Sequence, residues 1–481
     1  MRFILYVSIL LTILPLVFFR PFFGLCIYYV VSLLQPKLLC WRDDFQDSLL
    51  IGVPFVIGAI AIGVRNTHVL PDRDQVTGQI KGVITKITRS KLFEPSWMIA
   101  ISAMLVIYIS ITRFLTPFPL EHTSYQFRSF CKVLLVAALL TGLVTDSRRF
   151  RILFLVIALS TAFWAIKGGL KVILIGPHQV YGKSYDNNLF ALTSVMALPM
   201  VFYFGLSVKH ARWRALLLVC SALMCLAIIG SRSRAGFVAF AVILMCMAWG
   251  SRYRLRALFG VMLVVGLVAA LSSKEVTERI DSILAYRDDF SARSRFRTWE
   301  VARGLFVKSP LIGVGFNNFE LAQQQYFGGR KAAHNIFLQN LSELGIIGHP
   351  LWLAIIFGSM LSLLLFMRRA RSLPPDMRWS YHCSRGLLLG MLGFCLHGFF
   401  HNEEYLELMF AMVGLGIALQ TVTKRELRTR RLIAMSEGGQ GEDEDRVKGD
   451  RPTPIEGHPG RLFDRPRSLG ALIRYGIRPA R

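Results

Sequence analysis

The chain contains few charged residues for its size. Only 18% of its 481 residues are Asp, Glu, Lys or Arg, while 53% are hydrophobic, and the mean hydropathy is +0.47. A soluble chain of this length carries more charge and fewer apolar side chains. The composition therefore excludes an ordinary soluble protein and predicts a membrane protein.

The cysteines lack the spacing of a disulfide framework or a zinc site. The chain has eight of them and no CxxC, and most lie inside apolar runs: Cys26, Cys40, Cys131, Cys220, Cys225, Cys246, Cys383 and Cys395. We expect them to be small buried apolar residues.

Acidic residues are also scarce, with 30 Asp and Glu against 56 Lys and Arg, and the formal net charge is +26. The basic excess follows helix ends and the C-terminal tail, and forms no aromatic-interleaved patch on a soluble domain. We therefore expect contacts with anionic lipid headgroups and no nucleic-acid partner.

Long apolar runs predict an all-α polytopic membrane protein, because each can cross a bilayer of about 30 Å. We expect 12 crossings, or 13 if the first two runs cross separately. The runs lie near 3–19, 22–34, 48–64, 97–113, 128–145, 150–166, 188–207, 214–230, 234–250, 255–272, 344–367, 385–401 and 404–422. The first run lacks a small-residue cleavage site, so it indicates an anchor and not a removed signal peptide.

The orientation follows from the distribution of basic residues over the short loops, because Lys and Arg concentrate on the cytoplasmic side. One alternating set of loops holds 20 Lys and Arg: 65–96, 146–151, 208–214, 251–256 and 368–385. The opposite set holds 7. This bias predicts that the long segment 273–343 lies outside, which in the inner membrane of a bacterium is the periplasm.

Three regions follow from these patterns. Residues 1–125 form an N-terminal membrane block whose cytoplasmic loop, 65–96, is a candidate interfacial amphipathic segment. Residues 126–422 form a membrane core that includes the periplasmic loop 273–343. Residues 423–481 mix Gly, Pro and both charges, so we expect a disordered basic cytoplasmic tail.

Two arginines contradict the charge bias. Arg232 and Arg234 lie in "GSRSRAG", a short turn on the predicted periplasmic side. Guanidinium groups fit a phosphate or a carboxylate, and a lipid-linked phosphate is the abundant candidate at this surface. Snorkelling to headgroups is the alternative. Arg234 is the better phosphate ligand, because the small residues Ala235 and Gly236 follow it and permit close approach.

The outer segment contains a predicted amphipathic helix on the bilayer surface. In "FSARSRFRTWEVARG", Arg295, Trp299 and Ala302 share one helical face, whereas Arg293 and Arg297 point elsewhere. The stretch "KSPLIGVGFNNF" then breaks the helix, and its glycines predict a turn whose backbone amides can approach a ligand.

The run "KAAHNIFLQNLSELGIIG", 331–348, precedes the next membrane helix. In helical register it forms two stripes, one of His334, Leu338 and Leu341 and the other of Asn335, Gln339 and Ser342. We expect His334 to face inward, where a neutral imidazole can take a proton from a hydroxyl group. A histidine at a helix start also commonly has a purely structural role.

Taken in order, "SRSRAG", "SRFRTWEVA", "SPLIGVGFNNF" and "AHNIFLQNLSELGIIG" resemble the O-antigen ligase and polymerase family of bacterial membrane glycosyltransferases. The likeness covers residues 1 to about 422. "YDNNLFALTSVMALPM" and the N-terminal block resemble, more narrowly, the exosortase-associated putative O-glycosylation ligases.

This resemblance implies a GT-C-like, metal-independent, inverting transferase without a cofactor. Its donor would be a glycan on an undecaprenyl diphosphate carrier, and its acceptor a hydroxyl group of a glycan, lipid or protein at the periplasmic face. His334 would be the catalytic base. Arg234 and Arg295, with Arg232 as the alternative to Arg234, would hold the diphosphate. Trp299 and Asn335 would support the site.

The pair His397 and His401, with Glu403 and Glu404, is the one metal-like group in the sequence. The family pattern places no metal there, so packing or acceptor contact is the expected role.

Three alternatives remain open. A polymerase would join lipid-linked repeat units, whereas a ligase moves the finished glycan to another molecule, and the narrower resemblance favours the ligase. A transporter of a lipid-linked glycan would also place arginines in a membrane cavity. A non-catalytic scaffold for envelope assembly is the third.

Overall fold

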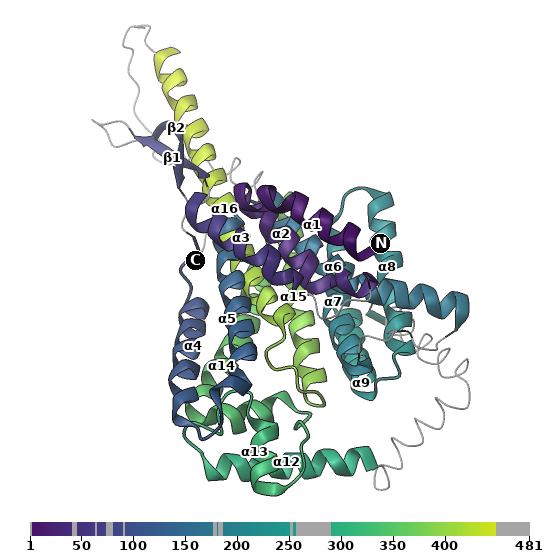
Figure 1. Ribbon diagram of the computed structural model, residues 1–481. Coiled ribbons are helices and arrows are strands. Elements are labelled where there is room, and N and C mark those ends of the chain that lie inside the picture. Colours follow the sequence, from purple (N-terminus) through teal and green to yellow (C-terminus); the bar gives the residue numbers. More distant parts are fainter. Residues whose placement is uncertain are drawn as a thin grey trace, which may run out of the picture.

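The computed structural model describes residues 2–40, 46–62, 65–73, 80–89, 92–176, 180, 186–250, 254–255 and 290–448. Within these residues every regular element is helical except for one two-stranded hairpin (Figure 1). The predicted class, a polytopic α-helical membrane protein, is confirmed.

Seven described helices are long and apolar enough to cross a membrane. They are α1 (Arg2–Phe19), α4 (Trp97–Leu115), α5 (Leu120–Leu143), α6 (Ser147–Ile175), α7 (Asn187–Ser207), α8 (Ala211–Gly230) and α14 (Ile336–Ala370). Each contains one of the predicted runs. The predicted count of 12 or 13 crossings is not confirmed, and the run 255–272 lies outside the described residues.

Further helices occupy the other apolar runs that lie within the described residues. These are α2 (Pro21–Tyr29) with the π-helical turn η1 (Val30–Leu34), α3 (Asp47–Ile62), α9 (Arg234–Trp249), α15 (Arg378–Gly398) and the start of α16 (Glu407–Lys448). Two 3₁₀ turns, η2 (Pro36–Cys40) and η3 (Pro375–Met377), lie in connections.

Helix α7 lies at the centre of the bundle, in contact with α6, α8, α9 and α15. Its apolar window is 78% buried, against 11% for the peripheral helix α1. Close packing between α7 and α15 depends on small residues. A Cβ on Gly390 would lie 2.6 Å from the Met196 carbonyl oxygen, and one on Gly386 would lie 3.1 Å from the Met200 Cα.

The predicted cytoplasmic loop 65–96 contains the β-hairpin. Strands β1 (Arg65–Arg73) and β2 (Ile80–Arg89) pair antiparallel, with Arg65 opposite Arg89, and the hairpin lies beside α16. Because "GVITKIT" is rich in β-branched residues, it favours a strand. The predicted interfacial amphipathic segment is therefore a pair of strands over these residues.

The C-terminal tail is helical for longer than the sequence analysis predicted. Helix α16 continues through residues 423–448, where disorder was expected. Its Arg, Lys, Glu and Leu residues are good helix formers, and Arg430 pairs with Glu426 one turn earlier at 2.9 Å. The rest of the predicted tail, 449–481, lies outside the described residues.

The outer part consists of α12 (Phe290–Lys308), α13 (Phe319–Phe327) and the turn between them, all at one end of the bundle (Figure 1). Helix α14 is kinked at Gly345, whose φ is +64°. The amides of Val314 and Gly315 donate hydrogen bonds, each 2.9 Å long, to the Ser342 and Glu343 carbonyls. The GxG amides predicted to approach a ligand therefore bond to α14 instead.

We predict that Gly345→Ala destabilises the protein. Its φ of +64° and ψ of −171° suit glycine alone, and a Cβ would lie 2.4 Å from the Leu311 carbonyl oxygen. The backbone strain alone is about 1–3 kcal/mol. Thermal unfolding in detergent measures the effect. Gly416→Ala is the control, because its Cβ would make an ordinary 3.5 Å contact with Leu363. Equal melting temperatures for the two variants would contradict the prediction.

Candidate functional site

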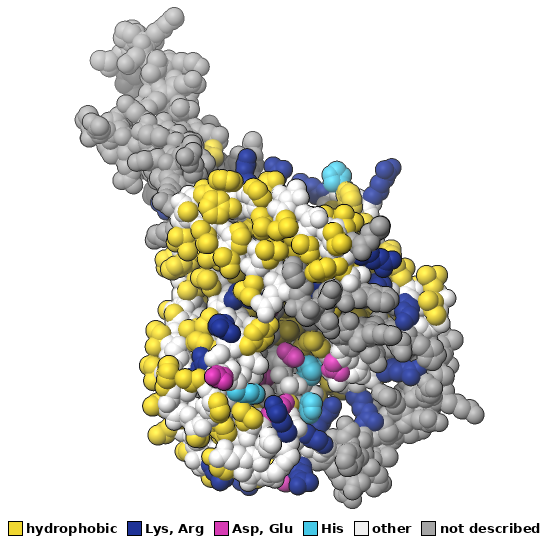
Figure 2. All heavy atoms as spheres, in the orientation of Figure 1, with side chains coloured by type: hydrophobic (Ala, Val, Ile, Leu, Met, Phe, Trp, Pro, Cys, Tyr) yellow, Lys and Arg dark blue, Asp and Glu magenta, His cyan; other side chains and the backbone are white. Residues whose placement is uncertain are grey.

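Charged and histidine side chains gather in a hollow on one face of the molecule (Figure 2). Hydrophobic side chains cover the surface over α1 to α3, farther from α12 and α13 on the same face. Electrostatic contacts connect His334, in the loop before α14, with Asp186 before α7, Arg295 of α12 and His401 in the loop between α15 and α16. A polar hollow beside an apolar belt is where a membrane enzyme can do polar chemistry.

His334 lies in the loop between α13 and α14, half-buried, with a left-handed backbone at φ +51°. The sequence analysis placed it within a helix, but α14 begins only at Ile336. Asn335 is the N-cap, and its Oδ1 accepts hydrogen bonds from the Phe337 and Leu338 amides at 3.0 and 3.1 Å. Because α14 starts only after this cap, His334 lies in the bend that precedes the helix and not on a helical face.

The sequence analysis expected His334 to face inward on a helical stripe with Leu338 and Leu341, but this stripe is not the more buried of the two. The buried stripe is Asn335, Gln339 and Ser342, whereas Leu338 and Leu341 are half-buried. Polar side chains face the interior here because the buried surface they meet is itself polar. His334 reaches the hollow through its bend, without belonging to either stripe.

Both backbone polar groups of Ala333, the residue before His334, form hydrogen bonds with side chains. The Ala333 carbonyl accepts hydrogen bonds from Trp299 Nε1 at 3.1 Å and from Thr298 Oγ1 at 3.2 Å. The Ala333 amide donates to Gln339 Oε1 at 3.0 Å. These contacts support a left-handed residue that would otherwise cost about 1 kcal/mol or more.

Arg295 is on the buried face of α12, as the periodicity predicts. It is half-buried and its guanidinium lies 5.9 Å from the centre of the Phe400 ring. On the same helix Ala302 is buried, whereas Arg297 is exposed. The Arg293 side chain lies outside the described residues. The exposure pattern supports Arg295 over Arg297 as the arginine of the site.

Arg234 is the first residue of α9, and the start of that helix is fixed against α7. The N-cap Ser233 accepts a hydrogen bond from the Gly236 amide at 3.1 Å and donates one to Asn188 Oδ1 at 2.7 Å. A Cβ on Gly236 would lie 2.7 Å from the Ala191 Cβ, so the small residue permits this approach. Arg232, two residues before Arg234, has a left-handed backbone at φ +56°.

Electrostatic interactions connect His334 with residues from three other segments. Burial lowers the pKa of His334, the Arg295 charge lowers it further, and the Asp186 charge raises it. Burial also lowers the pKa of His401 to about 4, with His334 and Arg295 acting in the same direction and Asp186 opposing them. His334 is therefore a neutral imidazole near pH 7, which is the form that accepts a proton.

Sequence reasoning missed Asp186 and the contacts of Gln339, although it had named His397, His401, Glu403 and Glu404 as a polar group expected to serve packing or acceptor contact. Asp186 caps α7 and acts on His334, and Gln339 was noted only as part of a stripe. Glu403 has a pKa raised to about 7 by burial and by Asp186. His397 and His401 stack edge to face at 5.4 Å. In the described part of the chain no group of three His, Cys, Asp or Glu residues is arranged to hold a metal ion. The motif "HNEEYLE" was the one available signal.

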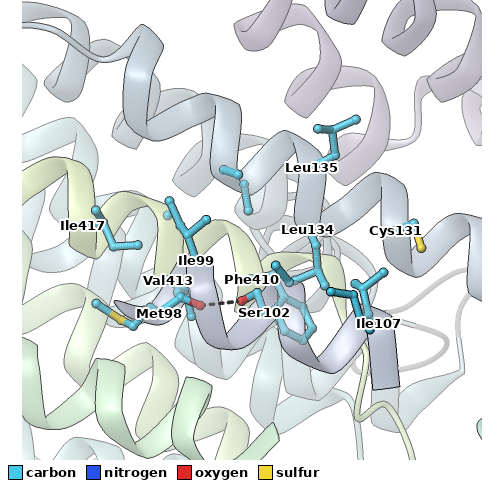
Figure 3. A pocket seen from close by; sticks show the side chains of 15 residues that line it. Met98, Ile99, Ser102, Ile107, Cys131, Leu134, Leu135, Phe410, Val413 and Ile417 are labelled. Atoms are coloured by element: carbon cyan, nitrogen blue, oxygen red, sulfur yellow. Dashed lines mark hydrogen bonds between the residues drawn. The ribbon is translucent and has the colours of Figure 1, made fainter. Parts of the chain in front are cut away.

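An apolar groove of about 320 Å³ lies elsewhere, between α4, α5 and α16 (Figure 3). Ile99, Leu134 and Val413 are among the side chains that line it. Its one hydroxyl, that of Ser102, donates to the Met98 carbonyl at 2.8 Å. The groove offers no group for acid-base or phosphate chemistry, so the polar hollow is the candidate site.

Taken together, the helices and the hollow define a polytopic membrane protein with a polar site at one end of its bundle. Residues 219–353 match the model of the O-antigen ligase family, so this part of the chain resembles an O-antigen ligase domain. Arg234, Arg295 and His334 all lie within the matched residues. The family resemblance is confirmed, while the exosortase-associated subtype is not tested and stays a prediction.

Residues 76–209 match a family of unknown function. A search of curated proteins found no match to this chain.

We predict opposite shifts in the His334 pKa when its two charged neighbours are neutralised. Arg295→Gln removes a charge that lowers the pKa, so the pKa should rise. Asp186→Asn removes a charge that raises it, so the pKa should fall. Diethyl pyrocarbonate modifies the neutral imidazole, and its pH profile at His334, read by peptide mass spectrometry, reports the midpoint. The unsubstituted protein should have a midpoint below the ordinary value of 6.5. Shifts in the same direction would contradict this assignment.

Proposed function

We propose that the protein is an O-antigen ligase-like glycosyltransferase of the bacterial inner membrane. It transfers a glycan from an undecaprenyl diphosphate carrier to an acceptor hydroxyl group at the periplasmic face. The observation that carries this proposal is the placement of a half-buried neutral His334 beside Arg295, within the ligase-family region. The orientation rests on the distribution of Lys and Arg over the loops.

In the proposed reaction His334 takes the proton of the acceptor hydroxyl as its oxygen forms a bond to the anomeric carbon of the donor sugar. The bond between that carbon and the diphosphate oxygen breaks, and the electron pair leaves with the diphosphate. Arg295 and Arg234 neutralise the growing charge on the leaving group, a contribution of several kcal/mol in a poorly hydrated site. Attack opposite the leaving group inverts the anomeric centre.

Each supporting residue has a role in this scheme. Trp299 and Asn335 position His334, because Trp299 donates to the carbonyl of the preceding residue and Asn335 caps the start of α14 directly after it. Arg232 is the alternative to Arg234, but Arg234 stands at the helix start that Ser233 and Gly236 fix against α7. The reaction needs neither a cofactor nor a metal ion, since the guanidinium groups supply the positive charge.

The proposed division of the chain follows the sequence analysis. Residues 126–422 form the ligase-like core with the periplasmic loop 273–343, and residues 1–125 form an additional N-terminal block. A polymerase that joins lipid-linked repeat units uses the same chemistry. Product analysis separates them, because a ligase adds one preassembled glycan to a different molecule.

We predict that His334→Gln abolishes transfer without abolishing donor binding. General base catalysis contributes about 10²–10⁴-fold, so the rate should fall by that factor. The measurement uses purified protein, an undecaprenyl diphosphate glycan and candidate acceptors in the presence of a chelator. His210→Gln, at an exposed residue before α8, is the control. Full activity of His334→Gln, or product that requires added divalent metal, would refute the mechanism. A transporter would instead move its substrate without this base.

We predict that Arg295→Gln and Arg234→Gln slow transfer far more than Arg297→Gln. Arg297 lies on the same helix as Arg295 but is exposed, so it controls for loss of charge. Arg232→Gln should have the smaller effect of the two substitutions in the α8–α9 turn. Initial rates over a range of donor concentrations measure these effects. Equal losses for Arg295→Gln and Arg297→Gln would remove Arg295 from the site.

A further inference from the structure

A polar cavity of about 460 Å³ adjoins the hollow, with which it shares Gln339 and Glu403, and extends toward α5. It is enclosed by α5, the turn before α13, the start of α14 and residues 402–407. Five carboxyl groups line it: Glu320, Glu343, Glu403, Glu404 and Glu407. The proposed chemistry uses none of them, so the cavity requires its own explanation.

Glu404 is the most informative of these residues. Its side chain is 2% exposed, and its Oε1 accepts a hydrogen bond from Gln339 Nε2 at 3.1 Å. Its Oε2 has no hydrogen-bond partner among the residues that the structure describes. A buried carboxyl oxygen without a partner costs about 1–3 kcal/mol. A hydroxyl group in the cavity would supply the missing partner.

Glu343 shows how a carboxyl group without a ligand is satisfied in the same cavity. Its oxygens accept hydrogen bonds from the Asn317 amide at 2.9 Å and from the Phe319 amide at 3.4 Å. Gln339 Nε2 also lies 3.4 Å from it. Glu343 therefore anchors the start of α13, whereas Glu404 has an oxygen available for a ligand.

One wall of the cavity is aromatic. The ring of Phe316 lies 5.8 Å from that of Phe130 and 4.7 Å from that of Tyr405, and Phe130 and Tyr405 lie 4.9 Å apart. Aromatic faces pack against the C–H surface of a sugar ring, while carboxyl and amide groups bond its hydroxyls. The combination of this wall with Glu404 and Gln339 suits a pyranose ring.

The charge of the cavity separates it from the diphosphate site. Among the described residues that line the cavity, Arg330 is the one guanidinium group, and it pairs with Glu320 at 3.4 Å. Burial raises the pKa values of Glu403 and Glu404, so these carboxyl groups can carry a proton and donate to a hydroxyl oxygen. The cavity therefore offers a diphosphate little unpaired positive charge, because Arg330 is paired with Glu320, whereas Arg234 and Arg295 belong to α9 and α12.

Gln339 connects the cavity to the catalytic loop. Its Oε1 accepts from the Ala333 amide, next to His334, while its Nε2 donates to Glu404 in the cavity. In Figure 1, α5 and α9 lie on opposite sides of the bundle, with α12 and α13 across the end between them. An acceptor in the cavity would thus approach the loop of the base from the side away from the α9 arginine.

We propose that this cavity binds a neutral sugar ring of the acceptor and presents its hydroxyl group to His334. The inference rests on the proposed function, which it deepens by naming the chemical class of the acceptor. Glu404 and Gln339 bond the hydroxyl groups, and Tyr405, the least buried of the three aromatic residues and held in place by the buried rings of Phe130 and Phe316, packs against the sugar ring.

Direct binding tests the cavity without requiring transfer. The probes are methyl α-glucoside, methyl α-galactoside and methyl α-glucosaminide, measured by saturation-transfer NMR with the full-length protein in detergent. His334→Gln should bind the neutral glycosides as the unsubstituted protein does. Glu404→Ala should weaken that binding about tenfold or more, since it loses a hydrogen bond to a buried carboxyl group. Inorganic pyrophosphate should bind equally to all three proteins.

Kinetics then separate the acceptor from the donor. Glu404→Gln, which keeps the shape of the side chain, should raise the acceptor KM and leave the donor KM unchanged. Glu121→Gln, at the exposed start of α5, is the matched control.

A rise in the donor KM alone would overturn the proposal. Equal glycoside binding by Glu404→Ala and the unsubstituted protein would also overturn it. If the protein binds methyl α-glucosaminide ten times more tightly than the two neutral glycosides, the proposal of a neutral sugar is wrong and the cavity binds an amino sugar. Glycoside binding without transfer would refute the proposed function and leave the cavity assignment intact.

Discussion

Backbone hydrogen bonds between the Pro310–Gly315 turn and the kink of α14 at Gly345 hold the outer end of the molecule together. The broken helix would leave carbonyl groups without partners, and the turn supplies amides to them at 2.9 Å. Both segments of this contact need glycine. A Cβ on Gly313 would overlap the backbone of Glu343, and a Cβ on Gly345 would overlap the backbone of Leu311. The kink in turn fixes Glu343 and Gln339, which lie within about two turns before it, and through them the loop of His334.

The site stores conformational strain where chemistry is proposed. Among the described residues, non-glycine positive φ angles occur at Gln35, Arg232, Asn317 and His334. Three of the four border the hollow or the cavity. Each is supported by neighbouring hydrogen bonds, as His334 is by Trp299 and Gln339, because a strained backbone persists only where its surroundings determine it. Most carboxyl groups line the cavity beside α5, whereas Asp186 lies close enough to His334 to oppose the effect of Arg295 on its pKa.

The helices could be predicted well because bilayer-length hydrophobic runs are a local property. The buried face of α12, with Arg295, Trp299 and Ala302, followed from periodicity for the same reason. The hairpin at 65–89 was missed because the segment was interpreted as a loop from its charged residues and glycines, and it lacks a clear alternation of apolar and polar residues. The helical extension of α16 beyond residue 423 was missed because composition suggested disorder while local helix propensity and the Arg430–Glu426 pair favoured a helix.

By itself, the sequence determined the membrane class, the positions of most helices and the residue types available for phosphate and proton chemistry, since these depend on composition and short spacings. Only the tertiary structure decided that His334 stands in a bend and not on a helix, that the GxG amides bond to α14, and that Asp186, Gln339 and Glu404 belong beside it. These depend on contacts between segments up to 200 residues apart. Such contacts are set by how helices pack and where glycine lets backbones meet, and no short stretch of sequence records that.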